Sequence, residues 1–231
     1  RGGVKHGWMG RWGKGMGLRT LPARVYHLAE AANWPSIRRS GLLSTTALLD
    51  QAGVQGNKRE RIERSQRLQH LVLPNGVQVR DQKPLPARAL AACLVGMLPS
   101  EWYGLINSQV FFWLDMDRLN RQRLACGSRP QVVLVIDVER LVARYGERMA
   151  LSRINSGNAR RRPARRGRCT FVPYREWVNS GWSSETEGLG LCLRERSHPP
   201  AELTVAGDAT DIMNCVTDIH RLSPGELLRS P

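Results

Sequence analysis

The stretch RVYHLAEAANWPSIRRSGLL, residues 24–43, is the part of this 231-residue chain around which the rest can be organised. The alternating run Val25–Leu28 predicts a strand, and the residues after it predict a helix that ends at Gly41. His27 lies near the end of the strand and Asn33 at the start of the helix, so polar groups gather where the two elements meet. Because such junctions often line ligand sites, the stretch predicts one half of a functional site.

The composition indicates a globular chain of ordinary apolar content. Hydrophobic residues make up 41% of the sequence, and no run of about 18 apolar residues is present that could span a membrane. The first residues lack the apolar segment of a secretory signal. The cysteines are scattered, without C-x-x-C spacing or nearby histidines, which argues against a metal site and favours reduced thiols in a cytoplasmic protein; they are Cys93, Cys126, Cys169, Cys192 and Cys215.

The net charge of +15 is concentrated in two segments. Residues 1–22 contain five Lys or Arg and residues 155–170 contain six Arg, and neither segment contains an acidic residue. Strong basicity of this kind is typical of nucleic-acid binding. Residues 1–22 are also rich in glycine and are expected to form a disordered extension. The alternative is a nucleic-acid-binding tail in which Trp8 and Trp12 stack on bases.

The remaining patterns predict an α+β fold with a split sheet, mixed or antiparallel, and flanking helices. The expected organisation is a single domain over residues 23–221, with an arginine-rich loop at 155–170 and a tail at 222–231. No G-x-G-x-x-G follows a strand and no P-loop motif is present, which excludes the common dinucleotide and nucleotide folds. The expected strands are 77–80, 109–114, 132–137, 149–154, 201–205 and 216–219, and the expected helices are 44–53, 57–70, 86–96, 99–107, 116–125 and 138–145, with 178–200 irregular.

Three side chains are the main candidates for chemistry, and each has a plain structural alternative. His27 either contributes to a site or is a satisfied histidine at a strand end. Glu202, inside the apolar run Ala201–Val205, faces either a cleft or solvent. Arg80, at the end of a strand, could clamp a phosphate with its planar guanidinium, or it could form an ordinary ion pair.

Several short blocks of the sequence resemble a known pattern. Tyr26-His27-Leu28, then Asn33 to Ile37 and Gly41-Leu42, is similar to the opening of DarT-type DNA ADP-ribosyltransferases and, more loosely, of RNA 2′-phosphotransferases. Val110 to Leu114 resembles their aromatic strand, and Ala201 to Val205 resembles the strand that carries their catalytic glutamate. A closer resemblance is to an uncharacterised bacterial domain family, DUF7002-like, which shares the Y-H-x-x-E-A-x-N-W, R-D-Q, F-F-W-L-D and I-N-S-G segments. The sequence departs from the DarT pattern after the aromatic strand, where Asp115-Met116-Asp117 precedes Arg118.

The resemblance implies an ADP-ribosyltransferase fold that binds NAD as a co-substrate. In that reading Glu202 stabilises the positive charge that develops on the ribose, Arg80 neutralises the pyrophosphate or assists the acceptor, and His27 bonds a ribose hydroxyl or the nicotinamide amide. The implied NAD-binding set is His27, Asn33, Trp34, Ser44, Thr45, Phe112 and Trp113. If the acceptor is DNA or RNA, the phosphate-facing arginines are Arg160, Arg161, Arg162, Arg165, Arg166 and Arg168.

Two other functions remain open from the sequence. One is a non-catalytic module on the same fold that binds a nucleotide or a nucleic acid. The other is a protein-binding domain without a small ligand. A pocket lined jointly by His27, Glu202 and the 110–114 strand would argue against the protein-binding domain, whereas placement of His27 and Glu202 on opposite sides of the sheet would argue against the enzyme.

Overall fold

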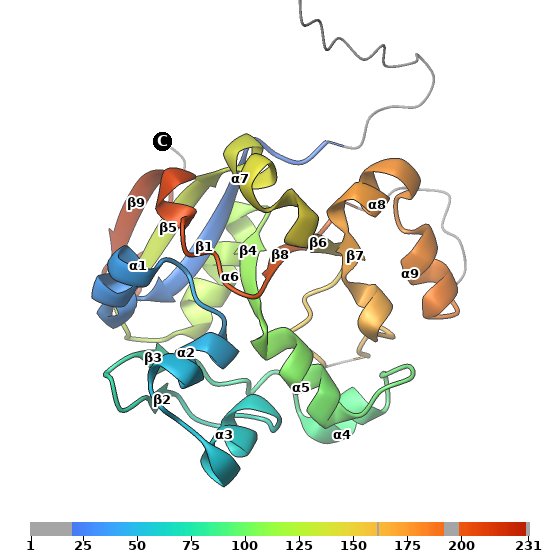
Figure 1. The fold of residues 1–231 in the computed structure, drawn as a ribbon, viewed down its shortest axis with the longest axis horizontal. Helices are drawn as coiled ribbons and strands as arrows, with labels where there is room; N and C mark the ends of the chain where they lie inside the picture. Colours follow the sequence, from blue (N-terminus) through green and yellow to red (C-terminus); the bar gives the residue numbers. More distant parts are fainter. Residues whose placement is uncertain (1–19, 161, 192–198, 230–231) are drawn as a thin grey trace, which may run out of the picture.

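An antiparallel sheet of seven strands forms the centre of the molecule, as shown by a computed structural model that describes residues 20–160, 162–191 and 199–229 (Figure 1). The strand order is β7-β6-β8-β4-β1-β5-β9, and every pair in it is antiparallel. The prediction of an α+β fold is therefore confirmed, and the sheet is antiparallel rather than mixed. The strands are β1 Arg24–Glu30, β4 Gln109–Trp113, β5 Gln131–Asp137, β6 Met149–Ser152, β7 Val172–Pro173, β8 Glu202–Ala206 and β9 Val216–Leu222.

Helices cover both faces of this sheet, and several begin at residues well suited to capping. Asp115 and Asp137 each accept a hydrogen bond from a backbone N–H in the first turn of the helix that follows. The α-helices are α1 Trp34–Ser40, α2 Thr45–Gln51, α3 Gly56–Glu63, α4 Ala87–Ala91, α5 Pro99–Asn107, α6 Met116–Ala125, α7 Val138–Tyr145, α8 Tyr174–Ser180 and α9 Ser183–Gly188. Short 3₁₀ turns lie at η1 Ala31–Asn33, η2 Gly146–Arg148, η3 Arg168–Thr170 and η4 Ile212–Asn214.

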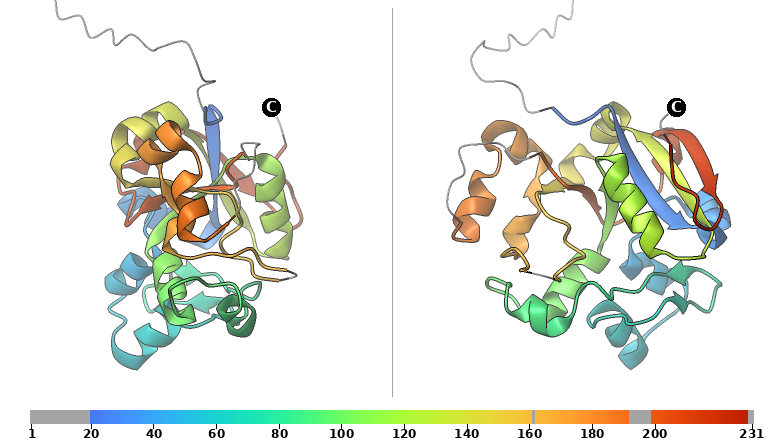
Figure 2. Two further views of the ribbon diagram at one scale, coloured as in Figure 1. Left: turned by 90° about the vertical axis from the view of Figure 1, so that its right-hand side faces the viewer. Right: turned by 180° about the vertical axis from the view of Figure 1, so that it is seen from behind.

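The two faces of the sheet have separate apolar cores. On one face α1, α7 and α8 pack against Val25, Phe112 and Leu203. On the other face α6 packs against Leu28 and Val133. Figure 2 shows α6 on one side of the sheet and α7 and α8 on the other. Because alternate residues of a strand point to opposite faces, this arrangement explains why β5 is apolar along almost its whole length.

A smaller lobe lies beyond one end of the sheet (Figure 1). It contains the hairpin of β2 Leu71–Val72 and β3 Gln78–Val79, which packs with α2 and α3 around its own apolar cluster. Beside it, α4 and α5 pack with Phe111 and Phe171. The lobe is inserted between α1 and β4, and it contacts β1, the strand that carries His27, through the ion pair of Arg80 with Glu30.

The sheet opens between two of its central strands. β1 pairs with β5 at seven positions, whereas β1 and β4 pair at one position only, Tyr26 opposite Trp113. Beyond that pair β1 and β4 diverge, and the side chain of His27 reaches the carbonyl oxygen of Phe111 across the gap. This opening corresponds to the split that the sequence predicts.

Some element boundaries differ from those expected. The helix at 57–70 ends at Glu63, because Arg67 turns back and donates hydrogen bonds to the carbonyls of Ile62 and Arg80. Much of the region 178–200 was expected to be irregular, yet α8 and α9 occupy its described first half, where buried Trp177 and Trp182 pack together.

The segment expected as a tail is partly packed. Asn120 of α6 exchanges two hydrogen bonds with the backbone of Leu228, with distances of 2.9 and 3.0 Å, and the Leu228 side chain is buried. Residues 222–229 therefore belong to the folded domain. The prediction that residues 1–22 form a disordered extension falls almost entirely outside the described residues, which begin at 20.

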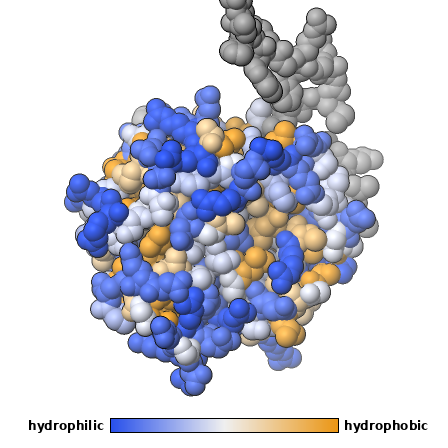
Figure 3. Space-filling model, viewed as in Figure 1, coloured by the Kyte–Doolittle hydropathy of each residue, from blue (hydrophilic) through white to orange (hydrophobic). Residues whose placement is uncertain are grey.

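Hydrophilic side chains cover most of the face shown in Figure 3, and apolar ones appear there in separate patches. This is the surface expected of a folded domain whose apolar side chains are gathered in internal clusters.

Gly41 fixes the end of α1 at a place where the chain is tightly packed. Its φ of +74° and ψ of −160° lie in a region that only glycine adopts readily. A Cβ at this position would lie 2.3 Å from the carbonyl oxygen of Thr210. The next residue, Leu42, pairs with Ala209 through two backbone hydrogen bonds, of 3.0 and 2.7 Å. The loop after β8, the strand that begins with Glu202, is thus held against the stretch that begins with β1.

Gly41→Ala is expected to lower the free energy of unfolding by about 3 kcal/mol or more, because it combines a strained backbone with a steric clash. Gly53→Ala is the matched control, since Gly53 also has a positive φ, of +65°, but a Cβ there would have no atom within 4 Å. It should cost about 1 kcal/mol. Urea denaturation measures both values, and equal losses would contradict the packing role of Gly41.

Candidate functional site

A cavity of about 690 Å³ opens where β1 and β4 diverge. It is bordered by β1, β3, β4, α6, the first residue of β8 and residues 155–158, and the small lobe closes one side of it. This volume lies within the range of about 300–1,000 Å³ that is typical of small-molecule and cofactor sites. The opening of the sheet therefore creates enough space for a ligand of that size.

His27 and Glu202 both line this cavity, although they point to opposite faces of the sheet. Glu202 is in register with Trp113, and Trp113 with Tyr26, so these three side chains share one face. His27 follows Tyr26 and points to the other face. The opposite orientation is the one that was expected to argue against an enzyme, because in a continuous sheet it would separate the two residues. Here the gap between β1 and β4 gives both of them access to one space, so the orientation does not separate them.

Glu202 is a buried carboxylate, with 4% of its surface exposed. Its Oε2 accepts a hydrogen bond from the backbone N–H of Ser156 at 3.0 Å. Burial raises the pKa of Glu202 to about 7, while the hydrogen bonds from Ser156 and the charges of Arg118 and Arg166 act in the opposite direction. The sequence left open whether Glu202 faces solvent or a cleft, and the structure places it at the cleft.

His27 spans the gap between the diverging strands. Its Nδ1 lies 2.8 Å from the carbonyl oxygen of Phe111, and its ring lies against Phe112 with the centroids 5.7 Å apart. A carbonyl oxygen can only accept, so Nδ1 carries the proton and Nε2 is left as a hydrogen-bond acceptor. Burial lowers the pKa of His27 to about 4, with the nearby charge of Arg80 acting in the same direction and the hydrogen bond to Phe111 acting against it. His27 is thus neutral at physiological pH.

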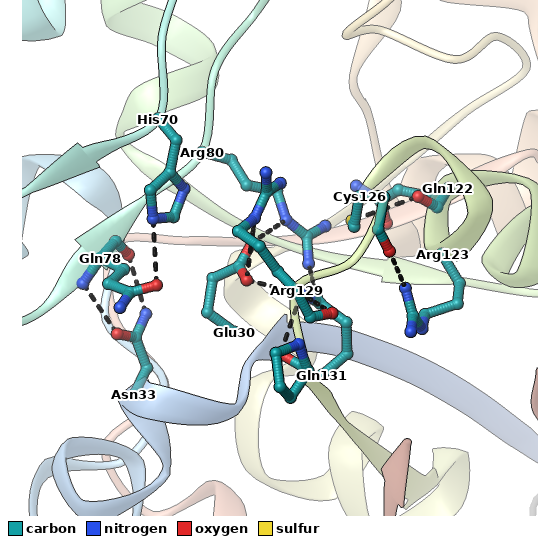
Figure 4. Close-up of polar contacts among 12 residues, drawn as sticks. Glu30, Asn33, His70, Gln78, Arg80, Gln122, Arg123, Cys126, Arg129 and Gln131 are labelled. Carbon is teal, nitrogen blue, oxygen red and sulfur yellow. Dashed lines mark hydrogen bonds and ion pairs between the residues drawn. The ribbon is translucent and has the colours of Figure 1, made fainter. Parts of the chain in front are cut away.

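Arg80 belongs to a charged cluster at another part of the cavity wall (Figure 4). Its Nε lies 3.1 Å from Oε1 of the buried Glu30, and the Nε of Arg129 lies 3.3 Å from Oε2 of the same carboxylate. Gln131 donates to Glu30 at 2.5 Å and accepts a hydrogen bond from Arg80. Two guanidinium groups therefore share one carboxylate, which leaves a net positive charge beside the cavity.

Asn33 also lines the cavity, but its amide group is already engaged. Its Nδ2 donates to the carbonyl of Gln78 and its Oδ1 accepts from the N–H of Gln78, both at 2.8 Å. The side chain of Gln78 is held in turn by His70 at 3.0 Å (Figure 4). These hydrogen bonds therefore connect β3 to the η1 turn that follows β1. Arg80, which comes directly after β3, is thereby placed close to the strand that carries His27.

The other residues predicted to bind NAD fall into two groups. Thr45, Phe112 and Trp113 line the cavity. Trp34 and Ser44 are not among its lining residues, and both are engaged in other contacts. Trp34 packs against the core of the sheet, and buried Ser44 caps α2 and donates two hydrogen bonds to Asp208, each of 3.0 Å.

The arginines of residues 155–170 also fall into distinct groups. Exposed side chains belong to Arg160, Arg162, Arg165 and Arg168. Arg161 lies outside the described residues. Arg166 has only 1% of its surface exposed, so its prediction as a phosphate contact is wrong. Its guanidinium instead donates to the backbone carbonyls of Ser156 and Ala164.

The structure adds residues that sequence reasoning did not assign to the site. Ser156 and Asn155 come from the I-N-S-G segment, and Arg118 and Arg121 project from α6. Glu30 comes from the Y-H-x-x-E pattern. These residues stood within or beside the segments that carried the resemblance, so they could have been proposed from it, but no pattern showed that they share a cavity with Glu202.

Among the described residues, no group of three or more His, Cys, Asp or Glu side chains is arranged to hold a metal ion. Within the same ranges, no helix combines the length and the apolar character that a membrane crossing requires. Cys93, Cys126, Cys169 and Cys215 are free thiols, and Cys169 is the exposed one of these four.

Comparison with solved structures finds two matches to one protein. They are Thermus sp. 2.9 DarT in complex with NAD+ and the same protein in complex with ADP-ribosylated ssDNA. Both are 12% identical in sequence to this chain, with TM-scores of 0.39 and 0.40. The first alignment covers 87% of this chain and 83% of that one, and the second covers 89% and 85%.

Comparison with curated protein sequences finds no match. Comparison with protein families finds one match that spans most of the folded domain, over residues 23–216, and its description is "Family of unknown function (DUF7002)". The matched range begins just before β1 and ends at the first residue of β9, so it contains every residue that lines the cavity. The chain belongs to the DUF7002 family.

Proposed function

We propose that this protein is an NAD-dependent ADP-ribosyltransferase that modifies a nucleic acid. The observation that carries the proposal is the joint placement of a buried carboxylate, Glu202, and a neutral histidine, His27, on the wall of one cavity of cofactor size. The resemblance of the surrounding segments to DarT-type enzymes supports the same assignment.

In the proposed reaction the bond between nicotinamide and ribose breaks, and its electron pair leaves with nicotinamide. Positive charge then develops on the ribose. Glu202 in its ionised form stabilises that charge in a site shielded from water, where electrostatic interactions are strong. A nucleophile of the acceptor forms the new bond to the ribose carbon and releases a proton, which the Glu202 carboxylate is able to accept because its pKa is about 7.

The remaining cavity residues have complementary roles. His27 offers Nε2 as an acceptor for a ribose hydroxyl or for the nicotinamide amide. Arg80, which shares the carboxylate of Glu30 with Arg129, provides positive charge for the pyrophosphate. Trp113 provides an aromatic surface for the nicotinamide ring, and its indole is held by a hydrogen bond of 2.7 Å to Gln122.

A nucleic-acid acceptor agrees with the distribution of positive charge around the cavity. Arg118 and Arg121 line it from α6, and Arg160 and Arg162 are exposed shortly after the cavity residues Asn155 to Asn158. Arginines that line an opening, together with exposed arginines in the segment that forms part of its wall, are suited to hold a phosphate backbone while a base enters the site. The proposed acceptor is single-stranded, because a base in a duplex would first have to leave the stack.

Glu202→Gln is expected to lower the release of nicotinamide from NAD by at least about a hundredfold, because it removes the charge that stabilises the transition state. Glu185→Gln is the matched control, since Glu185 is also buried but pairs with Arg153 outside the cavity. It should keep its turnover. Nicotinamide release is measured by chromatography. Equal turnover in the Glu202 variant and the wild type would reject the catalytic role of Glu202, whereas saturable NAD binding by the wild type without turnover would reject the enzyme.

Glu202→Gln should also change the dependence of stability on pH. The pKa of Glu202 is about 7 in the folded protein and 4.5 ordinarily, so its neutral form stabilises the fold at low pH and this contribution is lost as pH rises through about 7. Glutamine does not titrate. The free energy of unfolding of the variant, relative to that of the wild type, is therefore expected to be higher at pH 8 than at pH 5, by as much as about 3 kcal/mol.

Urea denaturation at both pH values measures this difference. The titration of His27, whose lowered pKa acts in the opposite direction, is common to both proteins and cancels in the comparison. A difference between the two proteins that does not change with pH would mean that Glu202 is not buried as described.

Replacement of Arg160 and Arg162 by glutamate is expected to weaken binding of a short single-stranded oligodeoxynucleotide. It should also reduce the salt dependence of binding: the slope of log K against log salt concentration should become shallower by about 0.7 for each phosphate that is no longer neutralised. The control replaces Arg38 and Arg39, which are exposed on α1, and so removes the same charge elsewhere. Fluorescence anisotropy at several salt concentrations compares the variants. Equal weakening by both pairs would show that net charge alone governs binding.

A further inference from the structure

Arg166 differs from the other arginines of its segment because its backbone is fixed inside the fold. Its N–H donates to the carbonyl of Cys93 at 2.9 Å, and its carbonyl accepts from the N–H of Val95 at 2.8 Å. The next residue, Gly167, is packed so closely that a Cβ there would lie 2.7 Å from the carbonyl oxygen of Val95. The position of Arg166 is therefore set by its surroundings, and a larger neighbour would displace it.

The side chain of Arg166 is directed to the backbone of the cavity wall. Its Nη1 donates to the carbonyl oxygen of Ser156 at 3.1 Å, and its Nε donates to Ala164 at 3.1 Å. The guanidinium lies over the ring of Trp102, 5.7 Å from the centroid. Arg166 forms no ion pair with a carboxylate among the described residues, and a buried cation without such a partner is costly to maintain.

Ser156 connects this arginine to Glu202. Ser156 is buried, and while its carbonyl accepts from Arg166, its N–H donates to Oε2 of Glu202 at 3.0 Å. The two contacts lie on opposite sides of one Cα atom. Fixing the carbonyl of Ser156 consequently restricts the direction of its N–H, which determines where the carboxylate is held.

We propose that Arg166 is a positioning residue that holds Glu202 in place through Ser156 and supplies the positive charge behind it. This proposal rests on the proposed function, because it assigns Arg166 to the same reaction. It assigns the buried arginine to the chemistry of the cavity rather than to the nucleic acid.

The charged groups that face Glu202 among the described residues are Arg118 from α6 and Arg166 from the 155–168 segment, and both lower its pKa. They differ in their other partners. Arg118 is half-exposed and its charge is shared with Asp115 at 2.9 Å, whereas Arg166 is buried and forms no such pair. On the neighbouring strands Glu202 lies opposite Trp113 and Ser152, which carry no charge. Arg166 is therefore the less screened of the two cations.

The test compares two variants. Arg166→Met removes both the charge and the hydrogen bonds, whereas Arg166→Lys keeps the charge but lacks the planar guanidinium group that donates to two carbonyls. The pKa of Glu202 is measured by carboxyl-carbon NMR, and nicotinamide release is measured across pH. In Arg166→Met the pKa of Glu202 and the acidic limb of turnover should both move to higher pH, and turnover at pH 7 should fall about tenfold or more. Arg166→Lys should lower turnover while the pKa stays close to that of the wild type.

Arg123→Met is the control for the loss of a buried arginine. Arg123 is fully buried and donates to the carbonyls of Gly127 and Ser223, outside the cavity wall. This variant should lose stability without a change in the pKa of Glu202.

A folded Arg166→Met variant in which both the pKa and the pH profile are unchanged would overturn the proposal. If that variant does not fold, full turnover by Arg166→Lys would overturn it. If the wild type releases no nicotinamide, the proposed function fails, whereas the pKa measurements still decide whether Arg166 acts on Glu202.

Discussion

The single paired position between β1 and β4, Tyr26 opposite Trp113, is the constraint on which the rest of this structure depends. Two neighbouring strands in the middle of a sheet would ordinarily form a full ladder, because unpaired buried backbone groups are costly. Here His27 meets part of that need, since its ring donates to the carbonyl of Phe111 across the gap. The same side chain that bridges the strands thus borders the space they enclose.

The opening also resolves an apparent conflict in the strand pattern. Strict alternation places His27 and Glu202 on opposite faces, and in a closed sheet that would separate them. A gap between the strands is accessible from both faces, so residues of opposite orientation line one cavity. The orientation of side chains along a strand therefore does not by itself decide whether two residues share a site. The pairing of the strands between them has to be known as well.

Local features of the sequence predicted many of the elements, because they depend on neighbouring residues. The strand at β1, the helix that ends at Gly41 and the apolar strand β5 follow from periodicity and from the glycine stop. What the sequence could not show is burial decided by distant contacts. Ser44 looked available for a ligand, but Asp208 binds it from the loop after β8. Arg166 looked like one of several loop arginines, but residues 93–95 fix it inside the fold. The same holds for the segment after β9, because no local pattern indicates that Asn120 binds the backbone of Leu228.

Two features that destabilise the fold, the buried carboxyl group of Glu202 and the buried guanidinium group of Arg166, both contact Ser156. This closeness favours a functional origin for both. A buried carboxyl group whose pKa is raised to about 7 destabilises the folded protein at neutral pH, as does a buried arginine that has no acidic partner among the described residues. Direct pairing of Glu202 with Arg166 would reduce both costs at once. Instead, Ser156 lies between them and contacts each through a different backbone group. This arrangement leaves the carboxylate without a direct ion pair to the buried arginine, so its charge is available to a positive charge that develops in the cavity.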